Sequence, residues 1–138
     1  MLNRTLGSLA AAVLVLSSAA SAQNASAGKE PVADGRKLSQ WVEDLKARAP
    51  QTRNAAAYEI SGMGPAAAAA VPALIDALDD PEASVRFPVT VALAEIGPQA
   101  KAAVPKLKKM VDDEINDEVA AAARRALRRI APQELTEQ

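Results

Sequence analysis

The acidic run DDEINDE, residues 112 to 118, places five carboxylates within seven residues. Calcium binds oxygen ligands of this kind, but a calcium-binding loop needs ligands at alternate residues and a central glycine. The run has neither. We expect its acids to lie in a turn between two helices and at the start of the second helix, where the helix macrodipole stabilises each by about 0.3 to 1 kcal/mol. The sequence therefore predicts no metal site here.

The chain contains no cysteine and no histidine. This composition removes disulfides, thiolate nucleophiles, the usual zinc ligands and the commonest general base of enzymes. The remaining residues form no recognisable set of base, nucleophile and orienting group. We therefore expect a protein that is not an enzyme and that uses no cofactor.

Four arginines, Arg124, Arg125, Arg128 and Arg129, come at the far end of the helix expected after the acidic run. Cations at this end of a helix complement its carbonyl groups, so a solvated helix end explains them. They can also form a docking patch for an acidic partner or for anionic lipid headgroups. No nucleic acid partner is expected, because the formal net charge is −1 and aromatic residues make up 2% of the chain.

The N-terminal stretch MLNRTLGSLAAAVLVLSSAASAQ is typical of a secretory signal peptide. One basic residue, Arg4, precedes an apolar run that is too short to span a bilayer comfortably. Small residues follow and suit cleavage between Ala22 and Gln23. The sequence predicts an exported protein, periplasmic or secreted, with no stable membrane span after cleavage. An uncleaved N-terminal anchor is the alternative.

After a flexible polar leader expected at residues 23–35, the sequence repeats itself. Gly64 and Gly97 align with a period of 33 residues (97 minus 64), and the prolines that follow them align as well. The period divides the domain at 36–132 into units at about 36–64, 65–97 and 98–131, followed by a tail at 133–138. Arrays of such short units bury their apolar faces only against their neighbours, and about three units are the minimum.

Each unit carries the apolar spacing of a pair of helices. Leu38, Trp41, Val42 and Leu45 follow the i, i+3, i+4, i+7 pattern of one helical face. The Gly-Pro step ends each pair, and the alanines after it form a tight connection that lets neighbouring pairs touch. The pattern predicts an all-α fold, a short right-handed α-solenoid of about three helical pairs.

The segment VRFPVTVALAEIGPQAKAAVPKLKKMV, residues 85–111, resembles the HEAT-like repeat of the phycobilisome-lyase type. The resemblance covers about residues 36–132 and implies a solenoid that binds a protein or peptide. It carries no lyase activity over, since no residue here matches a catalytic role. Arg53 and Arg86 match the arginine of the repeat, which the resemblance implies is structural and pairs with acids in the turns, such as Asp79 or Asp80. The third unit has Ala120 in that position.

The repeat also predicts a candidate partner-binding stripe on the second helix of each pair. Phe87 and Val91 are apolar where the family pattern is polar and exposed, and exposed apolar residues beside arginine suit a protein interface. The predicted stripe consists of Tyr58, Phe87, Val91, Arg125 and Arg129. The alternative is that Phe87 folds back as local core, assisted by Pro88 in the first turn of its helix.

A different function is also compatible with the sequence. Three units leave little end-capping, so the protein can be a structural subunit whose terminal faces stack on a partner or on a second copy. Trp41 near the front and the stretch Ala121, Ala122 and Ala123 behind are the candidate contact residues. Self-association is therefore possible.

Overall fold

The computed structural model describes residues 29–135. The predicted signal peptide and the first part of the leader lie outside this range, as do residues 136–138. The described chain begins with two short strands, continues as helical pairs and ends in a 3-10 turn. The elements are β1 (Val32–Ala33), β2 (Arg36–Lys37), α1 (Leu38–Asp44), α2 (Pro50–Gly62), η2 (Gly64–Ala70), α3 (Val71–Ala77), α4 (Ala83–Ile96), η3 (Gly97–Ala103), α5 (Val104–Asp113), α6 (Asp117–Ile130) and η4 (Pro132–Leu135).

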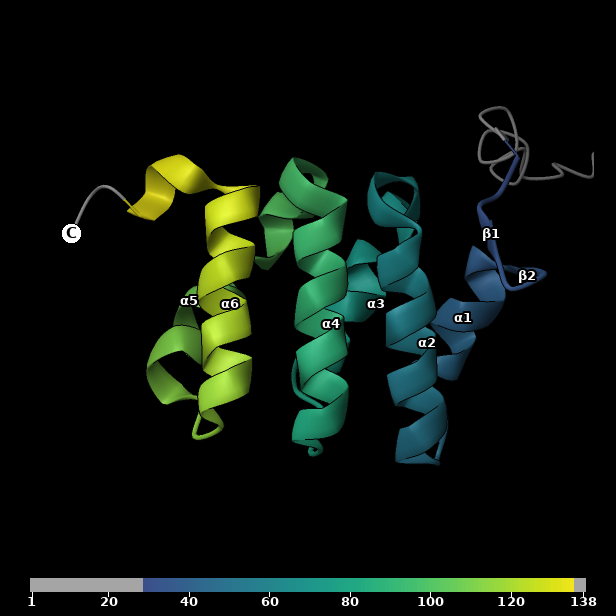
Figure 1. The fold of residues 1–138 in the computed structure, drawn as a ribbon, viewed down its shortest axis with the longest axis horizontal. Helices are drawn as coiled ribbons and strands as arrows, with labels where there is room; N and C mark the ends of the chain where they lie inside the picture. Colours follow the sequence, from purple (N-terminus) through teal and green to yellow (C-terminus); the bar gives the residue numbers. More distant parts are fainter. Residues whose placement is uncertain (1–28, 136–138) are drawn as a thin grey trace, which may run out of the picture.

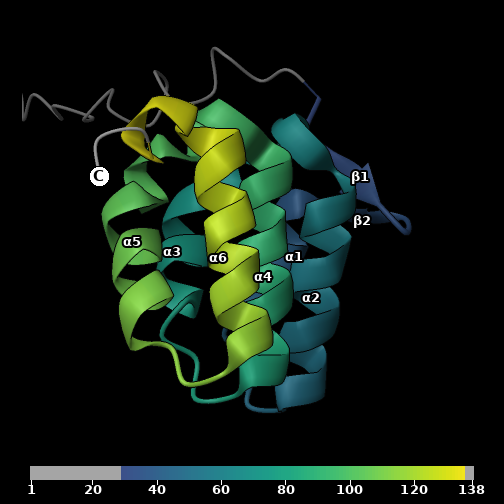
Figure 2. The same cartoon turned by 60° about the vertical axis from the view of Figure 1, so that its left-hand side comes forward.

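The helices form three antiparallel pairs stacked side by side. The second helices α2, α4 and α6 stand in one row, with α4 packed against both neighbours (Figure 1). The first helices α1, α3 and α5 form the other layer, which Figure 2 shows beside the first. The predicted all-α solenoid of helical pairs is confirmed. None of the helices between residues 29 and 135 has the length and apolar character needed to cross a membrane.

The Gly-Pro steps end the second helices as expected. Gly64 and Gly97 have φ angles of +55° and +76°, in the left-handed region that favours glycine. The alanines after them do not simply connect the pairs, because they form the 3-10 helices η2 and η3. Ala67 and Ala100 in these segments are fully buried, and small side chains are what allow the neighbouring pairs to approach there.

The core contains apolar residues that occupy equivalent positions in successive units of the repeat. Leu74 and Leu107, one period apart, are both fully buried, and Leu93 and Ile96 on α4 are buried between the neighbouring pairs. Apolar side chains from all three pairs form one continuous core cluster. No pair has a core of its own, so the stability of each pair depends on its neighbours.

A small hairpin covers the N-terminal end. β1 and β2 pair antiparallel, and the Trp41 indole Nε1 donates to the Ala33 carbonyl at 3.1 Å. The Arg36 guanidinium lies 3.9 Å from the centre of the Trp41 ring and donates to Asp44 at 2.8 Å. The ordered fold thus begins before residue 36, inside the segment expected to be a flexible leader.

Neither candidate stacking surface is an exposed apolar face. Trp41 is 7% exposed under the hairpin, and Ala122 and Ala123 are buried against neighbouring helices. Ala121 is partly exposed. The expectation that these residues form exposed contact surfaces at the two ends is wrong, because the hairpin covers Trp41 and the packing of α6 buries Ala122 and Ala123.

Candidate functional site

Two partly buried ion pairs connect the helical pairs on the side of the short turns. Arg53 on α2 donates from Nε and Nη2 to the two carboxylate oxygens of Asp80, at 2.6 and 2.9 Å. Its Nη1 donates to the carbonyls of Ala47 and Arg48 at 2.9 and 3.0 Å. The guanidinium therefore fixes its own turn and the next turn with one planar group.

Arg86 repeats this arrangement one unit later. It donates to both carboxylate oxygens of Glu114 at 2.7 and 2.8 Å, and to the carbonyls of Asp80 and Pro81 at 2.8 and 3.0 Å. We call the two pairs the arginine ladder. The expected pairing of Arg53 with Asp80 is confirmed, whereas Arg86 takes the Glu114 carboxylate and Asp79 pairs with Lys106.

The ladder also determines the ionisation of its acids. Burial raises the pKa of Asp80, but hydrogen bonds from Arg53 and from the Glu82 amide outweigh it and leave that pKa below its ordinary value. The hydrogen bonds from Arg86 lower the pKa of Glu114 in the same way, against the opposing effect of burial. Both carboxylates stay charged at neutral pH, as scaffold ion pairs need. The ladder ends at Ala120, where the third unit has no arginine.

Three of the five acids in the acidic run lie where they were expected, whereas Asp112 and Asp113 lie in the last turn of α5. Glu114 belongs to the ladder, and the Asn116 side chain caps α6 by accepting from the amides of Glu118 and Val119, both at 3.1 Å. Asp117 and Glu118 lie in the first turn of α6. Between residues 29 and 135 no group of three acids could hold a metal ion.

Part of the predicted stripe lines a hollow on the face formed by α2, α4 and α6. This second-helix hollow has a volume of about 360 Å³ and is lined by Asn54, Tyr58, Ala83, Ser84, Phe87, Asn116, Glu118 and Val119. Tyr58 is 48% exposed at its edge. Phe87 is partly buried and packs against the core, so it is both a wall of the hollow and a core residue.

The other three residues of the stripe lie outside the hollow. Val91 is partly exposed on α4, and Arg129 donates to Glu95 at 2.7 Å, which ties α6 to α4. Arg125 is exposed, without an ion-pair partner among residues 29–135. The structure therefore brings Tyr58 and Phe87 together, and it gives Arg129 a partner within the fold.

A polar contact that was not predicted joins two residues that line the hollow. Pro88 lies in the interior of α4, not in its first turn, so the Ser84 carbonyl loses the amide that would normally reach it. The Asn54 side-chain amide on α2 donates to this carbonyl at 2.5 Å. The sequence contained a hint of this contact. Asn54 lies one period before Phe87 (54 plus 33), and Phe87 directly precedes Pro88.

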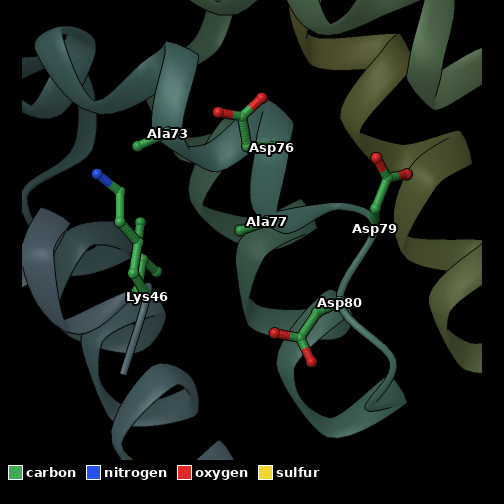
Figure 3. A pocket seen from close by; sticks show the side chains of 7 residues that line it. Lys46, Ala73, Asp76, Ala77, Asp79 and Asp80 are labelled. Atoms are coloured by element: carbon green, nitrogen blue, oxygen red, sulfur yellow. The ribbon is translucent and has the colours of Figure 1, made fainter. Parts of the chain in front are cut away.

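A second hollow lies on the opposite layer, between the turn that follows α1 and the C-terminal end of α3. Figure 3 shows Lys46 on one wall and three acids, Asp76, Asp79 and Asp80, on the other. The three carboxylates point in different directions, and two of them already bind Lys106 and Arg53. This hollow therefore offers no convergent acids for a metal or for acid–base chemistry.

The comparisons with known proteins agree with the geometry. The family model for HEAT repeats matches residues 38–128, from the first residue of α1 into α6. No curated protein and no solved structure matches the chain. The matched span includes both rungs of the arginine ladder and the second-helix hollow. The chain belongs to the family of HEAT repeat proteins.

Proposed function

We propose that the protein is an exported, non-catalytic adaptor that binds a protein or peptide partner in the second-helix hollow. HEAT repeats commonly mediate protein–protein interactions. The observation that carries the proposal is Tyr58, a large aromatic side chain that is 48% exposed beside the Phe87 wall of the hollow. Aromatic side chains at the edge of a preformed hollow are typical anchors of protein interfaces.

The hollow is rigid enough for this role. Its walls come from three helices that share one core, and the Asn54 amide holds the Ser84 carbonyl of α4, which also lines the hollow. A binding surface that is ordered before the partner arrives loses little conformational entropy on binding.

Within the HEAT-like repeats, we propose that the chain is of the phycobilisome-lyase type. The proposal rests on the resemblance of residues 85–111, and it does not include the lyase activity.

The binding proposal is tested by cross-linking and then by truncation. A photoreactive phenylalanine at position 58 of the full chain, in its native host, should cross-link a partner protein. The matched control is position 32, since Val32 is 53% exposed on the hairpin and lies outside the hollow. With the captured partner purified, Tyr58→Ala should weaken binding by about 2 kcal/mol, roughly thirtyfold, because it removes an interface anchor.

The melting temperature separates this effect from unfolding. Tyr58→Ala should leave it almost unchanged, because half of the side chain is already in water. Phe87→Ala should weaken binding and also lower the melting temperature, since Phe87 packs on the core. No cross-link at position 58, or an unchanged affinity of the Tyr58→Ala variant, would contradict the proposal.

Export has its own test. Protein recovered from the native host should begin at Gln23 and remain in the soluble fraction, because a signal peptidase removes the preceding residues. The intact mass measures this directly. A mass that retains residues 1–22, found in the membrane pellet, would show that the segment is an anchor instead.

A further inference from the structure

The C-terminal end of the solenoid carries a third hollow, of about 350 Å³, between α5, α6 and η4. We call it the end-face hollow. In Figure 1 this end lies opposite the hairpin. Its apolar lining comes from Val111, Leu127 and Leu135, and Leu135 is 38% exposed. A longer solenoid would cover this surface with another pair, and here the ladder has already ended at Ala120.

Two arginines on the rim give the hollow its charge. Arg124 and Arg128 are exposed, lie one helical turn apart on α6 and have no ion-pair partner among residues 29–135. The Lys108 ammonium on α5 donates to Glu134 at 2.6 Å, so those two charges neutralise each other. The other charge on the rim is Asp112. Two arginines face one acid, and the rim is therefore cationic.

The packing of α6 does not account for both arginines. Arg128 lies in the last turn, where the helix dipole favours a cation, but Arg124 lies one turn before it. Four arginines that hold the fold together each bind a carboxylate, namely Arg36, Arg53, Arg86 and Arg129. Arg124 and Arg128 instead present their donors to solvent beside an apolar lining.

We propose that the end-face hollow binds an acidic segment of a partner protein. An apolar side chain of that segment packs against Val111, Leu127 and Leu135, while two carboxylates pair with Arg124 and Arg128. The guanidinium fork suits carboxylates, and arginines one turn apart on a helix have Cβ atoms about 5 to 6 Å from each other, so both can bind one acidic segment. This surface is separate from the second-helix hollow, so it provides a second docking point on the same chain.

Fluorescence anisotropy with two labelled peptides tests the proposal on the full chain. One peptide is EELEELEE, and the other has serine in place of both leucines. The leucine peptide should bind at least about fivefold more tightly, because only it fills the apolar lining. Arg124→Glu with Arg128→Glu should weaken its binding at least about tenfold, since both carboxylate partners are lost and replaced by repulsion.

A matched charge reversal controls for net charge. Lys29→Glu with Arg48→Glu changes two exposed cations at the other end of the chain, and it should change binding by less than about threefold. Tyr58→Ala should leave peptide binding unchanged, which keeps this test independent of the second-helix hollow. Should the double glutamate variant fold poorly by circular dichroism, Arg124→Gln with Arg128→Gln replaces it.

Four results would overturn the proposal. The first is equal binding of the leucine and serine peptides, and the second is an equal loss of binding in the control reversal and in the end-face reversal. Binding of neither peptide also rejects it. The same holds if vesicles of phosphatidylglycerol and phosphatidylcholine capture the chain through Arg124 and Arg128 while the peptides do not bind, because the ligand is then an anionic membrane.

Discussion

Replacing Leu93 by Asp is expected to unfold all three helical pairs in a single transition. Leu93 is fully buried in the C-terminal half of α4, the helix that packs against both α2 and α6. A carboxylate at this position has no partner and must either stay charged without water or bind a proton. The cost is several kcal/mol, against a stability of about 5 to 15 kcal/mol for a domain of this kind.

The unfolding should be cooperative because the pairs share one core cluster. Circular dichroism of the Leu93→Asp variant should show a loss of helicity across the whole domain, and the native-like melting transition should disappear. Ser84→Asp is the matched control, since Ser84 is exposed in the first turn of the same helix, where a negative charge is favoured. Retained helicity and an unchanged melting temperature in Leu93→Asp would show that the core is arranged differently.

The features that the sequence predicts well are those that repeat. The period places Leu74 and Leu107 in one column, and both are fully buried because each unit packs on its neighbour in the same way. Gly64 and Gly97 take positive φ at the same point of the period. Repetition identifies the core because identical interfaces demand the same residue types at the same spacing.

The features that sequence reasoning misses depend on single contacts. The hairpin is short and polar at its turn, so its composition resembles a linker, and its packing depends on Trp41 and Arg36. Arg129 was predicted to face a partner, whereas it binds Glu95, one unit back (129 minus 34). The repeat offset indicates which positions of neighbouring units can pair. Whether the two side chains form the contact depends on their rotamers, and these depend on how the helices pack.

The candidate site also combines features that the repeat predicts with features that depend on single contacts. The repeat places Tyr58 and Phe87 on neighbouring second helices, and the structure brings them into one hollow. The contact of Asn54 with the Ser84 carbonyl, which Pro88 leaves without its helical donor, joins two units and could not be read from the repeat alone. The predicted stripe could be identified from the sequence. Whether Phe87 belongs to the surface or to the core depends on the packing of its side chain. In the structure, Phe87 lines the hollow and also packs against the core.

Arg86→Met is expected to destabilise the fold by about 2 to 3 kcal/mol, because it leaves the Glu114 carboxylate largely buried without its guanidinium. The Arg86 and Glu114 side chains are 15% and 7% exposed, so water compensates only in part. Urea unfolding at neutral pH measures the loss. Arg125→Met removes an exposed arginine without an ion-pair partner in the described chain and should change stability by less than about 0.5 kcal/mol.

The stability of the fold should depend on pH in a direction that the arginine ladder determines. The pKa values of Asp80 and Glu114 are lowered in the fold, so the folded state binds protons less readily than the unfolded state. Their contribution to stability is complete above the unfolded pKa of about 4, and it is lost as the pH falls through the lower folded values. The wild-type chain should therefore lose stability below about pH 4.

Without Arg86, the hydrogen bonds that lower the pKa of Glu114 most are gone, while burial still raises it. The stability of the variant should depend less steeply on pH below about 4, because Glu114 then no longer favours the folded state through ionisation.

Arg86→Met with Glu114→Met should recover much of the lost stability, since the buried charge is removed with its partner. Urea unfolding curves across the acidic range test all three chains. If Arg86→Met matches the wild type in stability and in its pH dependence, the ladder does not hold the repeats together, and the shared apolar core alone sets their stability.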